Sequence, residues 1–117
     1  MSKITIWHNP RCSKSRNAAN LLEERGIEAE VVRYLDTPPS KEEIKAVLKM
    51  LGISARELMR TKEAIYKELG LKDVEDEETL IEAMATHPKL IERPIVIKDG
   101  KAAIGRPIEK IIELLDL

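Results

Sequence analysis

The sequence predicts an α/β fold in which a βαβ unit and a ββα unit share one mixed sheet, with an all-helical insertion between them. Segments rich in β-branched residues occur near both ends of the chain, at residues 3–7, 28–35 and 93–104. Residues 40–87 instead carry apolar residues at helical spacing. Because 117 residues suit one domain, we expect residues 1–117 to form a single domain that carries the insertion at about 40–87.

The first unit is predicted to run strand, helix, strand. The strand over residues 3–7 leads into the short loop "HNPRCSKS". A helix from about Ser15 to Arg25 follows and ends at Gly26, and residues 28–35 form the second strand. A crossover of this kind is right-handed and returns the chain in the same direction, so the two strands should be parallel.

Capping signals divide the insertion into several helices. Ser40 with Glu43, and Ser54 with Glu57, fit the capping box, in which a serine hydroxyl and a glutamate three residues later satisfy the first N–H groups. Gly52 is suited to end the first of these helices. We expect helices at about 40–51, 54–60, 62–69 and 77–87.

The last unit is predicted to be a hairpin followed by a helix. Asp99-Gly100 is a strong turn signal between two short strands within residues 93–104. Pro107 begins the final helix, "PIEKIIELLDL". This order of elements matches the thioredoxin-like layout, which places the loop after the first strand beside the start of the hairpin.

Cys12 is the only cysteine, and it is either a small buried apolar residue or a nucleophile. It lies in a polar loop just ahead of a helix, where free N–H groups favour a thiolate. The positive neighbours Arg11 and Lys14, together with His8, also favour a lowered thiol pKa. These features favour a reactive thiolate, although a loop histidine is often only a polar surface group. Asn9 is suited to bonding the loop backbone.

Two other types of cysteine site do not fit. A phosphatase loop of the Cys-x5-Arg type needs arginine six residues after the cysteine, where this chain has Ala18. A Cys-x-x-Cys dithiol is absent because position 15 is serine. The lone thiol also excludes an internal disulfide, and the two histidines do not have metal-site spacing, so no metal is expected.

Three arginines are candidates for anion binding, although most arginines are solvated surface groups. Arg93 and Arg106 each directly precede a proline, which holds their backbone extended. Arg60 ends a short helix and is also suited to complementing its dipole as a C-terminal charge. If they converge, three guanidinium groups can bind a tetrahedral oxyanion.

Composition limits the classes of partner. The net charge of −1, from 20 basic and 21 acidic side chains, argues against a nucleic acid bound through bulk positive charge. No segment has the length of a membrane span, and no membrane partner is expected. A lone thiol is typical of a reduced compartment, so we expect a cytoplasmic protein.

Four ordered blocks resemble the glutaredoxin-coupled arsenate reductase family: "IWHNPRCSKSR", "ARELMRTKEAIYKELGL", "HPKLIERPIV" and "AIGRPIEKI". The resemblance extends from about residue 4 to residue 113. It implies the thioredoxin-like fold, with Cys12 as the nucleophile, His8 as the neighbour that helps to ionise it, and Pro94 as a cis-proline. It assigns oxyanion binding to Arg60, Arg93 and Arg106.

The resemblance implies an arsenate reductase that serves arsenic detoxification. Cys12 attacks arsenate, and glutathione, an external co-substrate, resolves the adduct with the help of glutaredoxin. No bound cofactor is implied, and we expect a monomer. Two alternatives stay open: a glutathione-dependent thiol oxidoreductase with another substrate, and a non-enzymatic transcription regulator that binds RNA polymerase.

Overall fold

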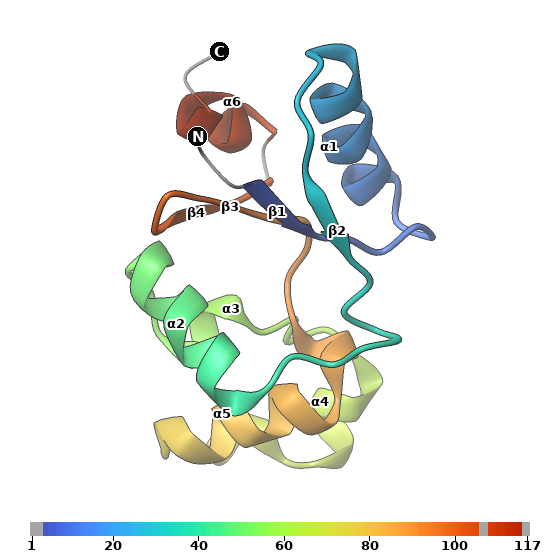
Figure 1. The fold of residues 1–117 in the computed structure, drawn as a ribbon. Helices are drawn as coiled ribbons and strands as arrows, with labels where there is room; N and C mark the ends of the chain where they lie inside the picture. The colour runs from blue at the N-terminus through green and yellow to red at the C-terminus, as the bar shows by residue number, and fades with distance from the viewer. Residues whose placement is uncertain (1–3, 106–107, 116–117) are drawn as a thin grey trace. The chain divides into compact units, whose positions relative to one another are not determined.

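The computed structural model describes residues 4–105 and 108–115. They form two compact units, which we call the sheet unit, up to Thr37 and from Arg93 onward, and the helical unit, Pro38–Glu92. The elements, labelled in Figure 1, are β1 (Ile4–Trp7), α1 (Ser13–Glu24), β2 (Glu30–Val32), α2 (Lys41–Leu51), α3 (Ala55–Leu58), α4 (Ala64–Glu68), the 3-10 turn η1 (Leu71–Asp73), α5 (Glu77–Thr86), the 3-10 turn η2 (Pro88–Leu90), β3 (Ile95–Lys98), β4 (Lys101–Ile104) and α6 (Glu109–Leu115).

The sheet unit contains a mixed four-stranded sheet in the order β2-β1-β3-β4. β1 pairs with β2 in parallel and with β3 in antiparallel fashion. β3 and β4 form an antiparallel hairpin, and its turn residues Asp99 and Gly100 have φ values of 50° and 76°. Positive φ at both positions matches the right-handed twist of the strands. The predicted α/β fold, with βαβ and ββα units in one sheet, is therefore confirmed.

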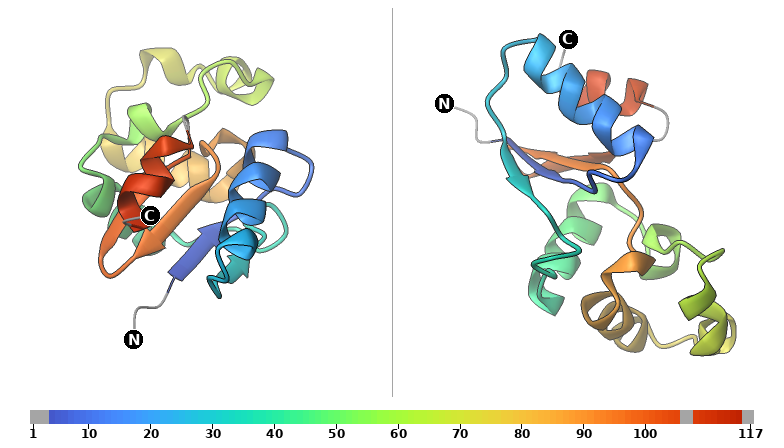
Figure 2. Two further views of the ribbon diagram at one scale, coloured as in Figure 1. Left: turned by 90° about the horizontal axis from the view of Figure 1, so that it is seen from above. Right: turned by 90° about the vertical axis from the view of Figure 1, so that its right-hand side faces the viewer.

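α1 and α6 cover the same face of the sheet (Figure 2). One apolar cluster joins them to the two central strands, and its fully or nearly buried members are Ile6, Ala18, Leu22, Val96, Ile111 and Leu115. Burying a side chain of this size stabilises the fold by about 1.5–3 kcal/mol. This cluster anchors both ends of the loop that carries Cys12.

β2 is shorter than the sequence indicated. Residues 28–35 were expected to form the strand, but only Glu30–Val32 do. The carbonyl of Arg33 accepts the N–H groups of Asp36 and Thr37, which turns the chain out of the sheet. Tyr34 is 1% exposed, so its apolar character reflects packing in a turn rather than in a strand.

The helical unit begins as its capping signals predict. Ser40 and Glu43 form a complete capping box at α2, and Ser54 and Glu57 form another at α3. Gly52 ends α2 in the left-handed conformation, at φ 69°. α2 and α5 pack against each other, and their buried residues are Ile44, Val47, Leu48, Leu80, Ile81 and Met84.

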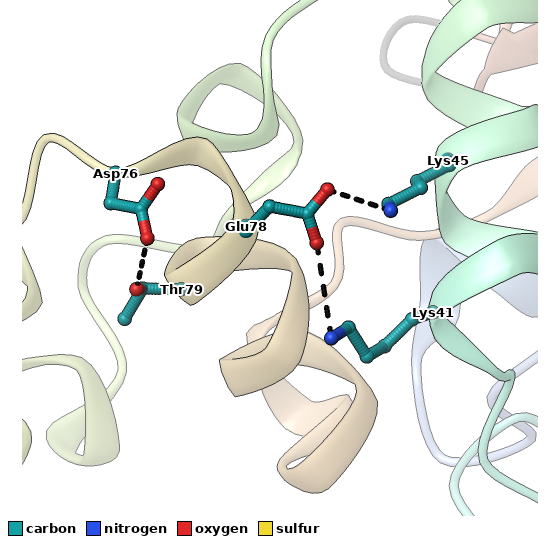
Figure 3. Close-up of polar contacts among 5 residues, drawn as sticks. All are labelled: Lys41, Lys45, Asp76, Glu78 and Thr79. Carbon is teal, nitrogen blue, oxygen red and sulfur yellow. Dashed lines mark hydrogen bonds and ion pairs between the residues drawn. The ribbon is translucent and has the colours of Figure 1, made fainter.

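Polar contacts of two kinds reinforce this unit. On its surface, Glu78 of α5 lies 2.6 Å from the ammonium of Lys45 and 3.8 Å from that of Lys41, both on α2, as Figure 3 shows. The Thr79 hydroxyl donates to Asp76 at 2.6 Å and closes the first turn of α5 (Figure 3). These side chains are exposed, so solvent screens their contribution to stability.

The second kind of contact is partly buried and centres on Arg56. Its guanidinium donates to the Tyr66 hydroxyl and to the carbonyl oxygens of Leu71 and Val74. Because these acceptors belong to α4 and to the chain around η1, one side chain of α3 joins two further segments of the helical unit.

The described residues contain neither a membrane-spanning helix nor a cluster of metal-ligating side chains. No helix among residues 4–105 and 108–115 has both the length and the apolar character needed to cross a membrane. The same residues contain no group of three or more His, Cys, Asp or Glu side chains placed to hold a metal ion.

Candidate active site

Cys12 is the residue immediately before α1 and occupies its N-cap position. Its backbone is extended, with φ −99° and ψ 125°, and its side chain is only 9% exposed. The Cys12 N–H donates to the carbonyl of Asn9 at 3.0 Å, and the Cys12 carbonyl accepts the N–H of Arg16 at 2.9 Å. The helix therefore starts two residues earlier than the sequence indicated, with the sulfur at its first turn.

The loop between β1 and α1 is held by its own side chains. The Asn9 amide oxygen accepts the N–H of Arg11 at 3.0 Å, which confirms the turn role predicted for Asn9. The Arg16 guanidinium donates to the carbonyl of Pro10 at 3.1 Å, from the first turns of α1 back to the loop. Few backbone positions of this short loop are left free to move.

The surroundings of Cys12 stabilise its thiolate. Burial raises the pKa of the thiol, but the N–H groups of Ser15 and Lys14 and the guanidinium of Arg93 outweigh that effect and lower the pKa to about 7. The contribution of helix N–H groups agrees with the sequence prediction. The side chains of Arg11 and Lys14, which the sequence also indicated, are exposed, and the guanidinium of Arg93 supplies the positive charge in their place.

Arg93 reaches Cys12 across 81 residues of sequence, as the thioredoxin-like layout predicts. The Arg93-Pro94 peptide bond is cis, as expected from the resemblance. The Pro94 carbonyl accepts the N–H of Gly105 at 2.8 Å. A Cβ at Gly105 would lie 2.8 Å from the Pro94 ring and 2.5 Å from Ile111, so a side chain there would force one of them to move.

Ser15 is a site residue that the sequence analysis missed. It is fully buried, and its hydroxyl lies 2.7 Å from Nδ1 of His8 and accepts the N–H of Asn9 at 2.9 Å. Its position in the helix three residues after Cys12 was used only to exclude a second thiol. The sequence does place Ser15 in the first turn of a predicted helix, seven residues after His8, and this spacing could have indicated a contact between them.

His8 contacts Ser15 rather than standing alone at the surface. Partial burial lowers its pKa, the charges of Arg33 and Arg16 lower it further, and the Ser15 interaction opposes this trend. The ring is therefore neutral at pH 7, and Nδ1 serves as donor or acceptor toward the hydroxyl according to its tautomer. The predicted help of His8 in ionising Cys12 stays a prediction.

Arg60 belongs to the helical unit and has two carboxylate partners there. Its Nη1 atom donates to Glu63 at 2.9 Å, and its Nε atom lies 3.3 Å from a carboxylate oxygen of Glu92. Its backbone N–H donates to the carbonyl of Leu90 at 2.7 Å. The Arg60 side chain is 26% exposed, so these ion pairs are partly screened by solvent.

The structure brings only some of the predicted site residues together. In the sheet unit, Arg93 interacts with Cys12. His8, at the start of the same loop as Cys12, contacts Ser15 in the first turn of α1. Arg60 is described within the helical unit, and Arg106 lies outside the described residues. The groups around Cys12 stabilise a thiolate, which can act as a nucleophile. The positive charge of Arg93 beside it suits an anionic electrophile.

Comparisons with known proteins assign the chain to a family. Residues 7–114 match the ArsC family. The chain is 58% identical to an arsenate reductase of Neisseria meningitidis serogroup A, over 98% of this chain and all of that protein, and 56% identical to the uncharacterized protein YfgD of Escherichia coli K12, over 97% of each. It superimposes on a solved arsenate reductase from Vibrio cholerae with a TM-score of 0.92, at 50% identity, over 95% of this chain and 96% of that one. This chain belongs to the ArsC family.

Proposed function

We propose that this protein is an arsenate reductase and that Cys12 is its nucleophile. The observation that carries the proposal is the Cys12 thiol, whose pKa is lowered to about 7 by N–H groups of α1 and by Arg93. A full-length relative 58% identical to this chain is an arsenate reductase, which supports arsenate as the electrophile.

The first step is the attack of the Cys12 thiolate on arsenic. With a pKa of about 7, roughly half of the thiol is ionised at neutral pH, against a few per cent for an ordinary cysteine. A sulfur–arsenic bond forms, and one arsenate oxygen leaves as water after it is protonated. The product is a covalent adduct in which arsenic is still in the +5 state.

Arginines bind the oxyanion in this proposal. Arg93 already contacts the sulfur, so its guanidinium is in place to neutralise charge as the sulfur–arsenic bond forms. For Arg60 and Arg106, the proposal rests on the sequence resemblance. A guanidinium offers up to five N–H donors in a planar fork that matches an oxyanion.

His8 acts through Ser15 in this account. The Ser15 N–H stabilises the thiolate, and its hydroxyl is held by His8 and by the Asn9 N–H. A fixed Ser15 fixes the first turn of α1, which keeps the N–H groups aimed at the sulfur. His8 is therefore proposed as a positioning residue for Cys12.

An external thiol completes the reaction, because the chain has one cysteine. A glutathione thiolate attacks the Cys12 sulfur, and the sulfur–arsenic electron pair stays with arsenic, which leaves as arsenite in the +3 state. The two thiols are oxidised to one mixed disulfide, which balances the two electrons gained by arsenic. A glutaredoxin thiolate then attacks the glutathione sulfur and releases Cys12.

A coupled assay tests this function. NADPH oxidation is followed with glutathione, glutathione reductase, glutaredoxin and the protein, with and without arsenate. The proposal predicts oxidation that depends on both arsenate and the protein. A rate that is unchanged by arsenate, but that rises with a small mixed disulfide, would replace the proposal with a general thiol oxidoreductase.

A further inference from the structure

The two carboxylates beside Arg60 limit how an oxyanion can reach it. A guanidinium has two bidentate faces, the end face of Nη1 and Nη2 and the side face of Nε and Nη2. Glu63 contacts Nη1 at 2.9 Å, and Glu92 lies 3.3 Å from Nε. Each bidentate face therefore includes one nitrogen that already has a carboxylate partner, and a bidentate anion on Arg60 competes with that carboxylate.

The charge around Arg60, like its geometry, opposes the binding of an anion. One guanidinium and two ionised carboxylates give this group of three side chains, Arg60, Glu63 and Glu92, a formal charge of −1. The three side chains are between 23% and 30% exposed, so solvent screens this charge only in part. Arsenate, an anion at neutral pH, is repelled by the carboxylates while it is attracted by the guanidinium.

Glu63 is the carboxylate placed to give way. It belongs to the turn just before α4, only three residues from Arg60, and it is the most exposed of the three side chains. Its own side chain caps no helix N–H group, so its departure from Arg60 breaks no helix cap. The backbone N–H groups of both acids are bonded, that of Glu63 to the Arg60 carbonyl and that of Glu92 to the Leu58 carbonyl. The two acids differ in exposure, and Glu92 is the less exposed.

We propose that Glu63 is a specificity-determining residue that competes with the substrate oxyanion for the Arg60 guanidinium. With no anion bound, the Glu63 carboxylate contacts Nη1 of Arg60. The oxyanion binds through Nη1 only when Glu63 moves out. This inference rests on the proposed role of Arg60 in binding arsenate, and it assigns to Glu63 the control of anion affinity.

Two substitutions separate competition from positioning. Glu63→Gln removes the charge and keeps an oxygen that can still accept from Nη1, whereas Glu63→Ala removes both. Competition predicts tighter arsenate binding in both variants, by about three- to tenfold, because a partly screened repulsion is relieved. If Glu63 instead orients Arg60 for the substrate, the alanine variant binds arsenate more weakly than the wild type.

The experiment is a calorimetric titration of arsenate into the full chain without small thiols, together with the arsenate KM from the coupled assay. Glu68→Gln, on the exposed surface of α4, is the matched control for the loss of one negative charge. The inference predicts a lower dissociation constant and a lower KM for both Glu63 variants, and no change for the control.

The outcomes separate the two proposals. If Arg60→Met weakens arsenate binding but neither Glu63 variant strengthens it, the competition is overturned and the role of Arg60 stands. If Glu68→Gln strengthens binding as much as Glu63→Gln, the effect is one of net charge and the specific role is overturned. If arsenate neither binds nor is reduced in any variant, the proposed function itself fails, and this inference fails with it.

Discussion

Two arginines of this protein share a predicted role but have opposite surroundings. Arg93, in the sheet unit, interacts with the sulfur of Cys12 and lowers its pKa. Arg60, in the helical unit, lies between the carboxylates of Glu63 and Glu92. The positive charge of Arg93 thus acts on the Cys12 thiol, whereas the charge of Arg60 is balanced by two acids.

The difference shows that residue type alone does not define an anion site. Arg93 directly precedes Pro94, whose carbonyl accepts the Gly105 N–H, at the start of the hairpin. Arg60 follows a four-residue helix and is placed by its backbone bond to Leu90 and by its acidic partners.

The largest expected effect comes from Cys12→Ser. The substitution keeps a small polar side chain but removes the ionisable sulfur, so arsenate-dependent NADPH oxidation should fall to the background rate. Circular dichroism and the melting temperature should remain close to those of the wild type. Turnover that persists in this variant would place the nucleophile elsewhere.

The next effect is expected at both arginines. Arg93→Lys and Arg60→Lys each lose a bidentate fork, which should lower kcat/KM by about ten- to a hundredfold, while Arg25→Lys on the surface should have little effect. If both lysine variants retain wild-type kcat/KM, neither arginine binds the substrate.

The pH dependence of Cys12 alkylation sharpens this contrast. Iodoacetamide reacts with the thiolate, so the wild-type rate should rise through a midpoint near pH 7. Arg93→Met removes a group that lowers the pKa, and its midpoint should move to higher pH. Arg60→Met should leave the midpoint where it is. Equal shifts in both variants would contradict the separate roles given to the two arginines.

A smaller effect is expected from Gly105→Ala in the sheet unit. The added methyl group would lie 2.8 Å from the Pro94 ring and 2.5 Å from Ile111, so one of them must move. Overpacking of this kind costs about 1–3 kcal/mol of unfolding free energy. Urea unfolding should show the loss, and an unchanged midpoint would mean that the packing around Pro94 yields easily.

The smallest effect is expected on the surface of the helical unit. Glu78→Gln removes the ion pairs to Lys41 and Lys45 shown in Figure 3, but all three side chains are 42–55% exposed. Solvent screening leaves such pairs with little net stabilisation, so the urea midpoint should stay within error of the wild type. A loss comparable to that of Gly105→Ala would show that this contact holds α2 to α5 more firmly than its exposure suggests.

Local signals in the sequence were sufficient for much of the fold. The capping boxes at Ser40 and Ser54 and the turn at Asp99-Gly100 depend on residues a few positions apart, and the structure has all three features. The end of β2 was misjudged, because Tyr34 is buried in a turn and looks like a strand residue in the sequence.

The site was predicted less completely because its interactions are long-range. The layout of the fold placed Arg93 near Cys12, but no local pattern indicated that helix N–H groups would outweigh the nearby basic side chains. Ser15 was missed because its role depends on full burial against His8. The pairing of Arg60 with Glu92 joins residues 32 positions apart and leaves no periodic signal.

A single-turnover reaction tests most directly the central claim, that the one thiol of Cys12 cannot reduce arsenate alone. Protein freed of all small thiols is mixed with arsenate, and arsenite and the intact mass are measured before and after glutathione is added. The account predicts no arsenite at first. After glutathione is added without glutaredoxin, it predicts up to one arsenite per protein and the mass of one glutathione on Cys12. Stoichiometric arsenite from the thiol-free protein would contradict it.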